Sequence, residues 1–174
     1  MSGGAFAARA AMGLWTQEQF PAPPGDRSLI YVADENNKLV ALPFEAGAAT
    51  FDASAIAGSS KTAYVELKGK NAATLVARDS PRFYLFVPDQ PGARPPVLMR
   101  LTSRKSGRRM TVMTERGMKG FALSSAEIIK VRPRGLGRDA GFQYVELRPR
   151  EPLAPGEYAF VGTDLARIAT FRVP

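Results

Sequence analysis

The chain contains no cysteine and no histidine among its 174 residues. Without cysteine it can form no disulfide, no thiolate nucleophile and no Cys-ligated metal site. Without histidine it lacks the usual general base at neutral pH and the commonest imidazole ligand for metals. These two absences remove most hydrolase, transferase and zinc chemistry. We therefore predict a protein that is not an enzyme and requires neither a metal nor an organic cofactor.

Long apolar runs are also absent, since no stretch approaches the roughly 20 residues that a membrane-spanning helix requires. Near the start, Arg9 interrupts the only apolar stretch that could act as a secretory signal, so we expect no complete signal peptide. Pro21-Ala22-Pro23-Pro24-Gly25 then reads as a linker. The sequence predicts an N-terminal arm and linker at 1–25, either a short docking helix or a frayed arm, and one domain at 26–174.

Positive charge is plentiful and unevenly placed. The formal net charge is +8, and residues 100–150 hold 13 of the 24 Lys and Arg but only 4 of the 16 Asp and Glu. A basic field of this kind concentrates anionic partners such as nucleic acid, phospholipid or acidic glycan near the protein. The charge indicates the sign of a partner without identifying it.

From Leu29 onward, short segments rich in β-branched and aromatic residues alternate with period two between Gly, Pro, Asn or Asp. These segments are residues 29–34, 38–45, 49–54, 61–69, 72–79, 82–89, 97–104, 109–115, 142–148, 157–162 and 168–173. The pattern predicts an all-β protein, an antiparallel β-sandwich of immunoglobulin-like or jelly-roll-like type. Its expected core residues are Leu29, Val32, Leu39, Leu42, Val65, Leu67, Leu75, Phe83, Leu85, Val87, Val112, Val145, Leu147, Phe160 and Phe171.

The connections are predicted from their turn residues. Hairpins are expected at residues 34–37, 69–71, 106–107 and 152–156. Residues 124–131 are ambiguous, because Ser124 or Ser125 could cap one helical turn. The glycine-rich stretch 135–141 misses the spacing of a dinucleotide-binding fingerprint, and we expect a flexible loop there.

Three aromatic residues cluster in Arg82-Phe83-Tyr84-Leu85-Phe86-Val87. Arg82 and Tyr84 share one face of such a strand and could stack nucleic-acid bases. Phe83, Leu85 and Val87 form the opposite row, which is typical of a sandwich core. The core interpretation is favoured, since nothing else in the chain matches an RNA-recognition fold.

The stretch Ser103-Arg104-Lys105-Ser106-Gly107-Arg108-Arg109-Met110 places four cations around a turn. With Ser106-Gly107 as the two turn residues, Arg104 opposes Arg109 and Lys105 opposes Arg108. Like charges in opposed positions cost stability, although solvent and salt reduce the cost at an exposed tip to a few tenths of a kcal/mol.

Two interpretations of this tip stay open. The simpler one is a solvated tip without function, because exposed charges usually contribute little. The sharper hypothesis is that the tip cations and three further arginines bind a polyanion or an acidic surface of a partner subunit, because Arg forms bidentate contacts with phosphate and carboxylate. The candidate residues are Arg104, Lys105, Arg108, Arg109, Arg132, Arg134 and Arg138.

The chain contains, in order, the segments LIYVADENNKLVALPFE, SPRFYLFVPD, LMRLTSRKSGRRM, PLAPGEYAFVGTD and ATFRV. These segments resemble a loosely defined set of uncharacterised bacterial exported β-sandwich proteins, in which a Pro-Gly-Glu-Tyr hairpin precedes the last strands. The resemblance spans roughly Leu29 to Val173, the scale of one domain, and implies a periplasmic or secreted protein. We accordingly expect a binding module that presents a basic edge to an anionic or protein partner. The alternative is a structural subunit of a bacterial surface or virion assembly, whose arm reaches a neighbouring subunit. No small-molecule substrate is evident, and the sequence leaves the oligomeric state open.

Overall fold

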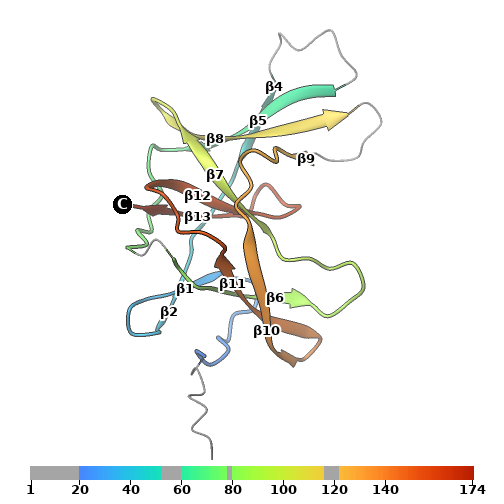
Figure 1. Cartoon of the computed structure of the whole chain (residues 1–174). Coiled ribbons are helices and arrows are strands. Elements are labelled where there is room, and N and C mark those ends of the chain that lie inside the picture. Colours follow the sequence, from blue (N-terminus) through green and yellow to red (C-terminus); the bar gives the residue numbers. More distant parts are fainter. Residues whose placement is uncertain (1–19, 52–59, 78–79, 116–121) are drawn as a thin grey trace, which may run out of the picture.

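The computed structural model describes residues 20–51, 60–77, 80–115 and 122–174 (Figure 1). Within these residues all regular elements are β-strands, and the strands pair antiparallel in two sheets that pack together. This architecture confirms the predicted antiparallel β-sandwich. Most of the predicted N-terminal arm, residues 1–19, lies outside the described residues.

The first sheet contains five strands among the described residues. Their order across the sheet is β10 (Val131–Asp139), β11 (Phe142–Pro149), β6 (Phe83–Pro88), β1 (Tyr31–Ala33) and β2 (Leu39–Ala41). β10 and β2 are therefore its edges.

The second sheet is larger and contains eight of the described strands. Seven follow the order β3 (Phe44–Glu45), β13 (Ile168–Val173), β12 (Gly156–Val161), β7 (Val97–Ser103), β8 (Gly107–Glu115), β5 (Ser60–Lys68) and β4 (Ala48–Phe51). The eighth, β9 (Ala122–Leu123), pairs with β8 beside β7. β7 and β8 pair only near their shared turn.

The central strands of the second sheet are apolar on both faces. On β12, Tyr158 and Phe160 join a cluster shared with the five-stranded sheet, whereas Ala159 and Val161 join a second cluster with β5 and β8. The sheet is curled, so that β4, β5 and β8 form a further layer beyond β7, β12 and β13 (Figure 1). Alternate residues of one strand thus supply two cores.

The predicted core is largely confirmed. Twelve of its fifteen residues are buried, and Leu29 and Leu39 are partly buried on the outer face of the first sheet. The prediction that Leu75 belongs to the core is wrong, because this side chain is 49% exposed while its neighbour Val76 faces the core. The predicted strand at 72–79 is present in its described part only as a parallel bridge between Leu75 and Arg172.

Two other strand predictions need correction. Residues 38–45 form two strands in different sheets, because the chain crosses between the sheets at Leu42 and Pro43. Residues 135–141 are no flexible loop, since most of them belong to β10, which ends in a turn at Ala140 and Gly141 with positive φ at both. Pro133 and the glycines of β10 lower its strand propensity, but an edge strand accommodates them.

The predicted connections are partly right. The hairpin at 34–37 joins β1 to β2, and Asp34 Oδ1 accepts hydrogen bonds from the backbone N–H of Asn36 and Lys38. No hairpin follows β5 at 69–71, because both edges of β5 already pair with β4 and β8. Residues 152–156 cross from one sheet to the other and are not a hairpin. Residues 124–127 form a turn, not a helix.

Candidate functional site

The turn between β7 and β8 carries the cations singled out in the sequence. Arg104 N donates to Gly107 O at 2.7 Å, so the two turn residues are Lys105 and Ser106. Arg109 faces Thr102, and the predicted register is therefore wrong by two positions. Gly107 is the first residue of β8, and the position favours glycine because a Cβ there would meet Leu67 O at 2.5 Å. A shift of two positions leaves every side chain on its predicted face.

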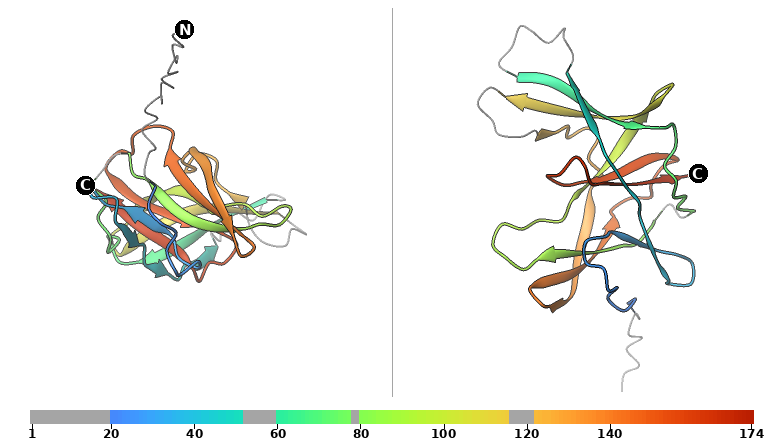
Figure 2. Two further views of the ribbon diagram at one scale, coloured as in Figure 1. Left: turned by 90° about the horizontal axis from the view of Figure 1, so that it is seen from below. Right: turned by 180° about the vertical axis from the view of Figure 1, so that it is seen from behind.

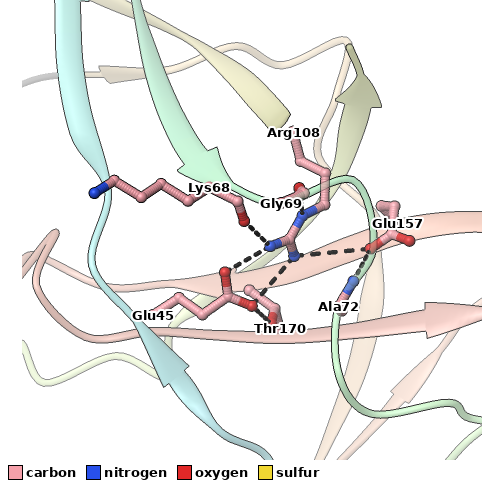
Figure 3. A network of polar contacts seen from close by, with 7 residues as sticks. All are labelled: Glu45, Lys68, Gly69, Ala72, Arg108, Glu157 and Thr170. Atoms are coloured by element: carbon pink, nitrogen blue, oxygen red, sulfur yellow. Dashed lines mark hydrogen bonds and ion pairs between the residues drawn. The ribbon is translucent and has the colours of Figure 1, made fainter. Parts of the chain in front are cut away.

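Arg108 points into the molecule, on the same face of β8 as Met110 and Val112, and is 1% exposed. Its Nη2 donates to Glu45 Oε2 at 2.6 Å, and its Nη1 lies 3.3 Å from Glu45 Oε1 (Figure 3). Glu157 Oε2 lies 3.8 Å from the same Nη1. Two carboxylates thus compensate one buried guanidinium.

Backbone groups complete this buried network. Arg108 Nε donates to Gly69 O at 2.9 Å and Nη2 donates to Lys68 O at 2.8 Å, so every guanidinium nitrogen faces an oxygen. Glu45 also accepts from the Thr170 hydroxyl, and Glu157 accepts from Ala72 N at 2.8 Å. The network in Figure 3 ties together β3, β8, β12, β13 and the chain after β5.

The prediction that Arg108 contacts a partner is consequently wrong, because its guanidinium is enclosed and each of its nitrogens hydrogen-bonds within the chain. The side chains of Arg104 and Lys105 are exposed and make no hydrogen bond or ion pair with any described residue. Arg109 is half-buried, with its guanidinium 4.1 Å from the centre of the Tyr64 ring and Glu66 opposite it on β5. The accessible tip is thus reduced to two free cations and one stacked arginine.

The remaining three candidates lie on β10, but on different faces. Arg132 and Arg134 pair with Arg148 and Glu146 on the outer face of the five-stranded sheet. A β-bulge between Gly135 and Gly137 shifts the register, which turns Arg138 to the opposite face. There Arg138 Nε lies 3.5 Å from Asp89 Oδ2.

The seven predicted residues do not form one site. The β7–β8 turn belongs to the second sheet and β10 to the edge of the first, and in Figure 1 the turn lies at the upper left whereas β10 runs down to the lower right. The structure instead brings two other arginines next to Arg132.

Three arginines lie in one row across three strands of the first sheet. Arg132 pairs with Arg148, and the register of β11 with β6, in which Leu147 pairs with Phe83, sets Arg148 beside Arg82. We call Arg82, Arg148 and Arg132 the arginine row. The sequence pattern indicates neither Arg148 nor Arg82 as part of a charged site, because the proline and glycines of β10 hide its strand character.

Glu146 fixes the middle of this row from a buried position. It is 1% exposed, and its Oε1 accepts from Arg148 Nε at 2.7 Å. Its Oε2 accepts from the Tyr84 hydroxyl at 2.7 Å. The pKa of Tyr84 is raised well above its usual range, mainly because the side chain is buried and secondly because of this hydrogen bond to Glu146. Arg148 is therefore held in place by a carboxylate that is itself anchored.

Tyr31, Tyr84, Phe86 and Tyr144 lie on the same outer face and form what we call the aromatic face. Arg82 and Tyr84 share this face as predicted, but Tyr84 is 0% exposed and has no free surface on which a base could stack. Phe83, Leu85 and Val87 face the sandwich core, which confirms the favoured interpretation of this segment.

Searches for other kinds of site give two negative findings for the described residues. No group of three or more carboxylates there is arranged to hold a metal ion. No helix there is long and apolar enough to cross a membrane.

Comparison with known proteins adds no relative. No family model, no curated protein and no solved structure matches this chain. The resemblance to bacterial exported β-sandwich proteins therefore stays a prediction, and the arrangement of residues carries the functional argument.

Proposed function

We propose that this protein is a non-enzymatic binding module that holds an anionic partner on the arginine row. The observation behind the proposal is that Arg132 pairs with Arg148 across β10 and β11, and that Arg82 immediately precedes Phe83, which pairs with Leu147. Like charges in directly opposed positions destabilise a sheet. A bound anion would compensate this repulsion.

The charges around the row leave room for an anion. Arg148 is paired with Glu146, and Arg82 donates to Asn37 Oδ1, whereas the exposed side chain of Arg132 makes no hydrogen bond or ion pair with any residue the structure describes. Lys130 and Arg150 are exposed beside it, linked by the hydrogen bond from Arg150 N to Lys130 O. The carboxylate of Glu146 pairs with Arg148 from a buried position.

The chemistry of the row favours oxyanions. A guanidinium presents planar paired N–H groups that match phosphate, sulfate or carboxylate oxygens. Neighbouring strands are about 4.8 Å apart, so three guanidinium groups can contact successive anionic groups of one extended polymer. We therefore favour a polyanion over an isolated small anion. Export of the module, as implied by the family resemblance, remains a prediction.

Heparin affinity, measured by the salt concentration that elutes the protein, tests this proposal. The test variant is Lys130→Ser/Arg132→Ser, and its matched control is Arg104→Ser/Lys105→Ser at the β7–β8 turn, because each removes two exposed cations. We expect the first variant to elute at clearly lower salt and the control to elute close to the parent.

Two outcomes contradict the proposal. If both variants lose the same amount of affinity, only net charge matters and the arginine row is not a site. If the parent is not retained even at low salt, the polyanion is excluded as a partner.

A further inference from the structure

The outer face of the five-stranded sheet is covered by the chain that precedes β1. The other sheet packs on the opposite face, yet Tyr31, Tyr84, Phe86 and Tyr144 are at most 8% exposed. We call residues 20–28 the strap, because they run across this face before the chain enters β1. In the left view of Figure 2, which looks from below, this blue segment passes in front of the strands.

The strap contacts four strands in turn. Phe20 lies under the Arg134 guanidinium on β10, 4.5 Å from ring centre to Cζ. The Pro21 carbonyl accepts from the Tyr144 hydroxyl on β11 at 3.2 Å, and the Asp26 carbonyl accepts from the Tyr31 hydroxyl on β1 at 2.9 Å. Arg27 lies 5.7 Å from the ring centre of Phe86 on β6.

The way the strap is attached is unusual for a segment lying on a sheet. Residues 20–25 make no backbone-to-backbone hydrogen bond with the rest of the described chain. Pro21, Pro23 and Pro24 have no N–H to donate. The attachment instead consists of tyrosine hydroxyls on backbone carbonyls, arginine–aromatic contacts, and an exposed ion pair between Arg27 and Asp139.

These are the contacts by which aromatic-lined grooves bind proline-rich segments. Such segments expose their carbonyls, lose little entropy on binding and pack their rings against tyrosines. The strap sequence Phe20-Pro21-Ala22-Pro23-Pro24-Gly25 has the matching composition. The aromatic face supplies the tyrosines and their hydroxyl donors, and Arg134 on β10 supplies a cation for the aromatic ring of the strap.

We infer that the aromatic face is a binding groove for a proline-rich peptide with an aromatic residue before its first proline. In this chain its own strap occupies the groove, and a partner segment of the same chemistry binds by replacing the strap. Because the strap is tethered, its effective concentration is on the order of millimolar, and the partner must compete with it. This inference is independent of the polyanion proposal, because it rests on Tyr31, Tyr144 and their neighbours.

The experiment uses a fluorescent peptide with the sequence of residues 20–28, FPAPPGDRS, which carries one Asp and one Arg and no net charge. The full chain is compared with the full-chain variant Phe20→Ser/Arg27→Ser, whose strap lacks the two side chains that anchor it to Arg134 and Phe86. We expect the variant to bind the peptide at least about tenfold more tightly than the parent, because competition within the chain is relieved. Binding should persist at roughly 0.5 M salt, where binding of a polyanion is screened.

Two controls test the chemistry of the groove. A peptide with alanine in place of its three prolines should not bind. Adding Tyr144→Phe to the strap variant removes the hydroxyl that donates to the Pro21 carbonyl, and we expect roughly fivefold weaker binding.

The inference is overturned if the folded strap variant binds neither peptide or binds both equally. Should the strap variant fail to fold, amide NMR of the parent decides the question. Shifts at Tyr31 and Tyr144 with about 1 mM of the proline peptide, and none with the alanine peptide, support the groove. Unchanged spectra with both peptides overturn it.

Discussion

Arg108 Nη2 lies 2.6 Å from Glu45 Oε2, although four strand steps separate β8 from β3 in the second sheet. In a flat sheet four steps span about 19 Å. The contact is possible because the sheet curls until its β3 edge approaches the inward face of β8. The ion pair therefore fixes the curl, and Glu157 on β12 lies between the two.

We predict that Arg108→Ala destabilises the protein by about 3 kcal/mol, since removing one partner of a buried ion pair leaves the other charge uncompensated. Arg109→Ala, one position along and stacked on Tyr64, should cost less than about 1 kcal/mol. Urea unfolding of both variants checks this. Equal losses would show that the network does not support the fold.

The same relationship affects how the β7–β8 turn should be tested for binding. A variant that removes Arg104, Lys105, Arg108 and Arg109 together should lose polyanion binding through unfolding. We expect its near-ultraviolet circular dichroism to be weakened, whereas Arg104→Ser/Lys105→Ser should keep the parent spectrum. A native spectrum for the fourfold variant would contradict the structural role of Arg108.

Gly107 gives a prediction about close packing of strands. Gly107→Ala should destabilise by about 1–3 kcal/mol, because the new Cβ would lie 2.5 Å from Leu67 O and the backbone must move. Gly137→Ala is the matched control, since nothing lies within 4 Å of its Cβ position, and its effect should stay within about 0.5 kcal/mol. Thermal unfolding of the two variants distinguishes these expectations.

The buried tyrosines predict a loss of stability in alkali. The pKa of Tyr144 is raised to about 12, mainly because the side chain is buried and secondly because of the negative charge of Glu146. Burial likewise raises the pKa of Tyr84. In the unfolded chain tyrosine releases its proton near pH 10, so the unfolded state binds fewer protons above that pH. The contribution of these two tyrosines to the free energy of unfolding should be constant below about pH 10 and fall as the pH rises towards 12.

Ultraviolet absorbance near 295 nm, followed together with circular dichroism, checks this prediction. Phenolate absorbance of the buried tyrosines should appear together with loss of the strand signal. Tyr144→Phe should make the alkaline decline less steep. Complete tyrosine ionisation in a folded protein would contradict the burial argument.

Strand alternation predicted the fold well, because the strands with a strict period of two, such as Phe83–Pro88, are those with one face in the core. The same alternation contained the signal for Arg108, which is in phase with Met110 and Val112. The cluster of four cations instead predicted that Arg108 belongs to an exposed turn. Its acidic partner Glu45 is 63 positions away, and no local pattern indicates such a contact.

The arginine row could not be predicted from the sequence, for a different reason. Pro133, Gly135 and Gly137 conceal β10, which tolerates them as an edge strand paired only with β11 among the described strands. Without β10 the register that sets Arg132 beside Arg148 cannot be derived, and the bulge that separates Arg138 from Arg134 leaves no clear mark in the sequence. Strand registers determine this site, and they depend on the whole sheet.

The buried network also has a kinetic consequence. Arg108 loses its water only when Glu45, Glu157 and the carbonyls after β5 have all arrived, and these groups come from distant parts of the chain. Contacts of such long range form late in folding. We expect Arg108→Ala to accelerate unfolding and leave the refolding rate nearly unchanged, so that its φ-value is close to zero. If the contacts of Arg108 are the last to form, this arginine determines mainly the unfolding rate, and therefore the lifetime of the native state once it has formed.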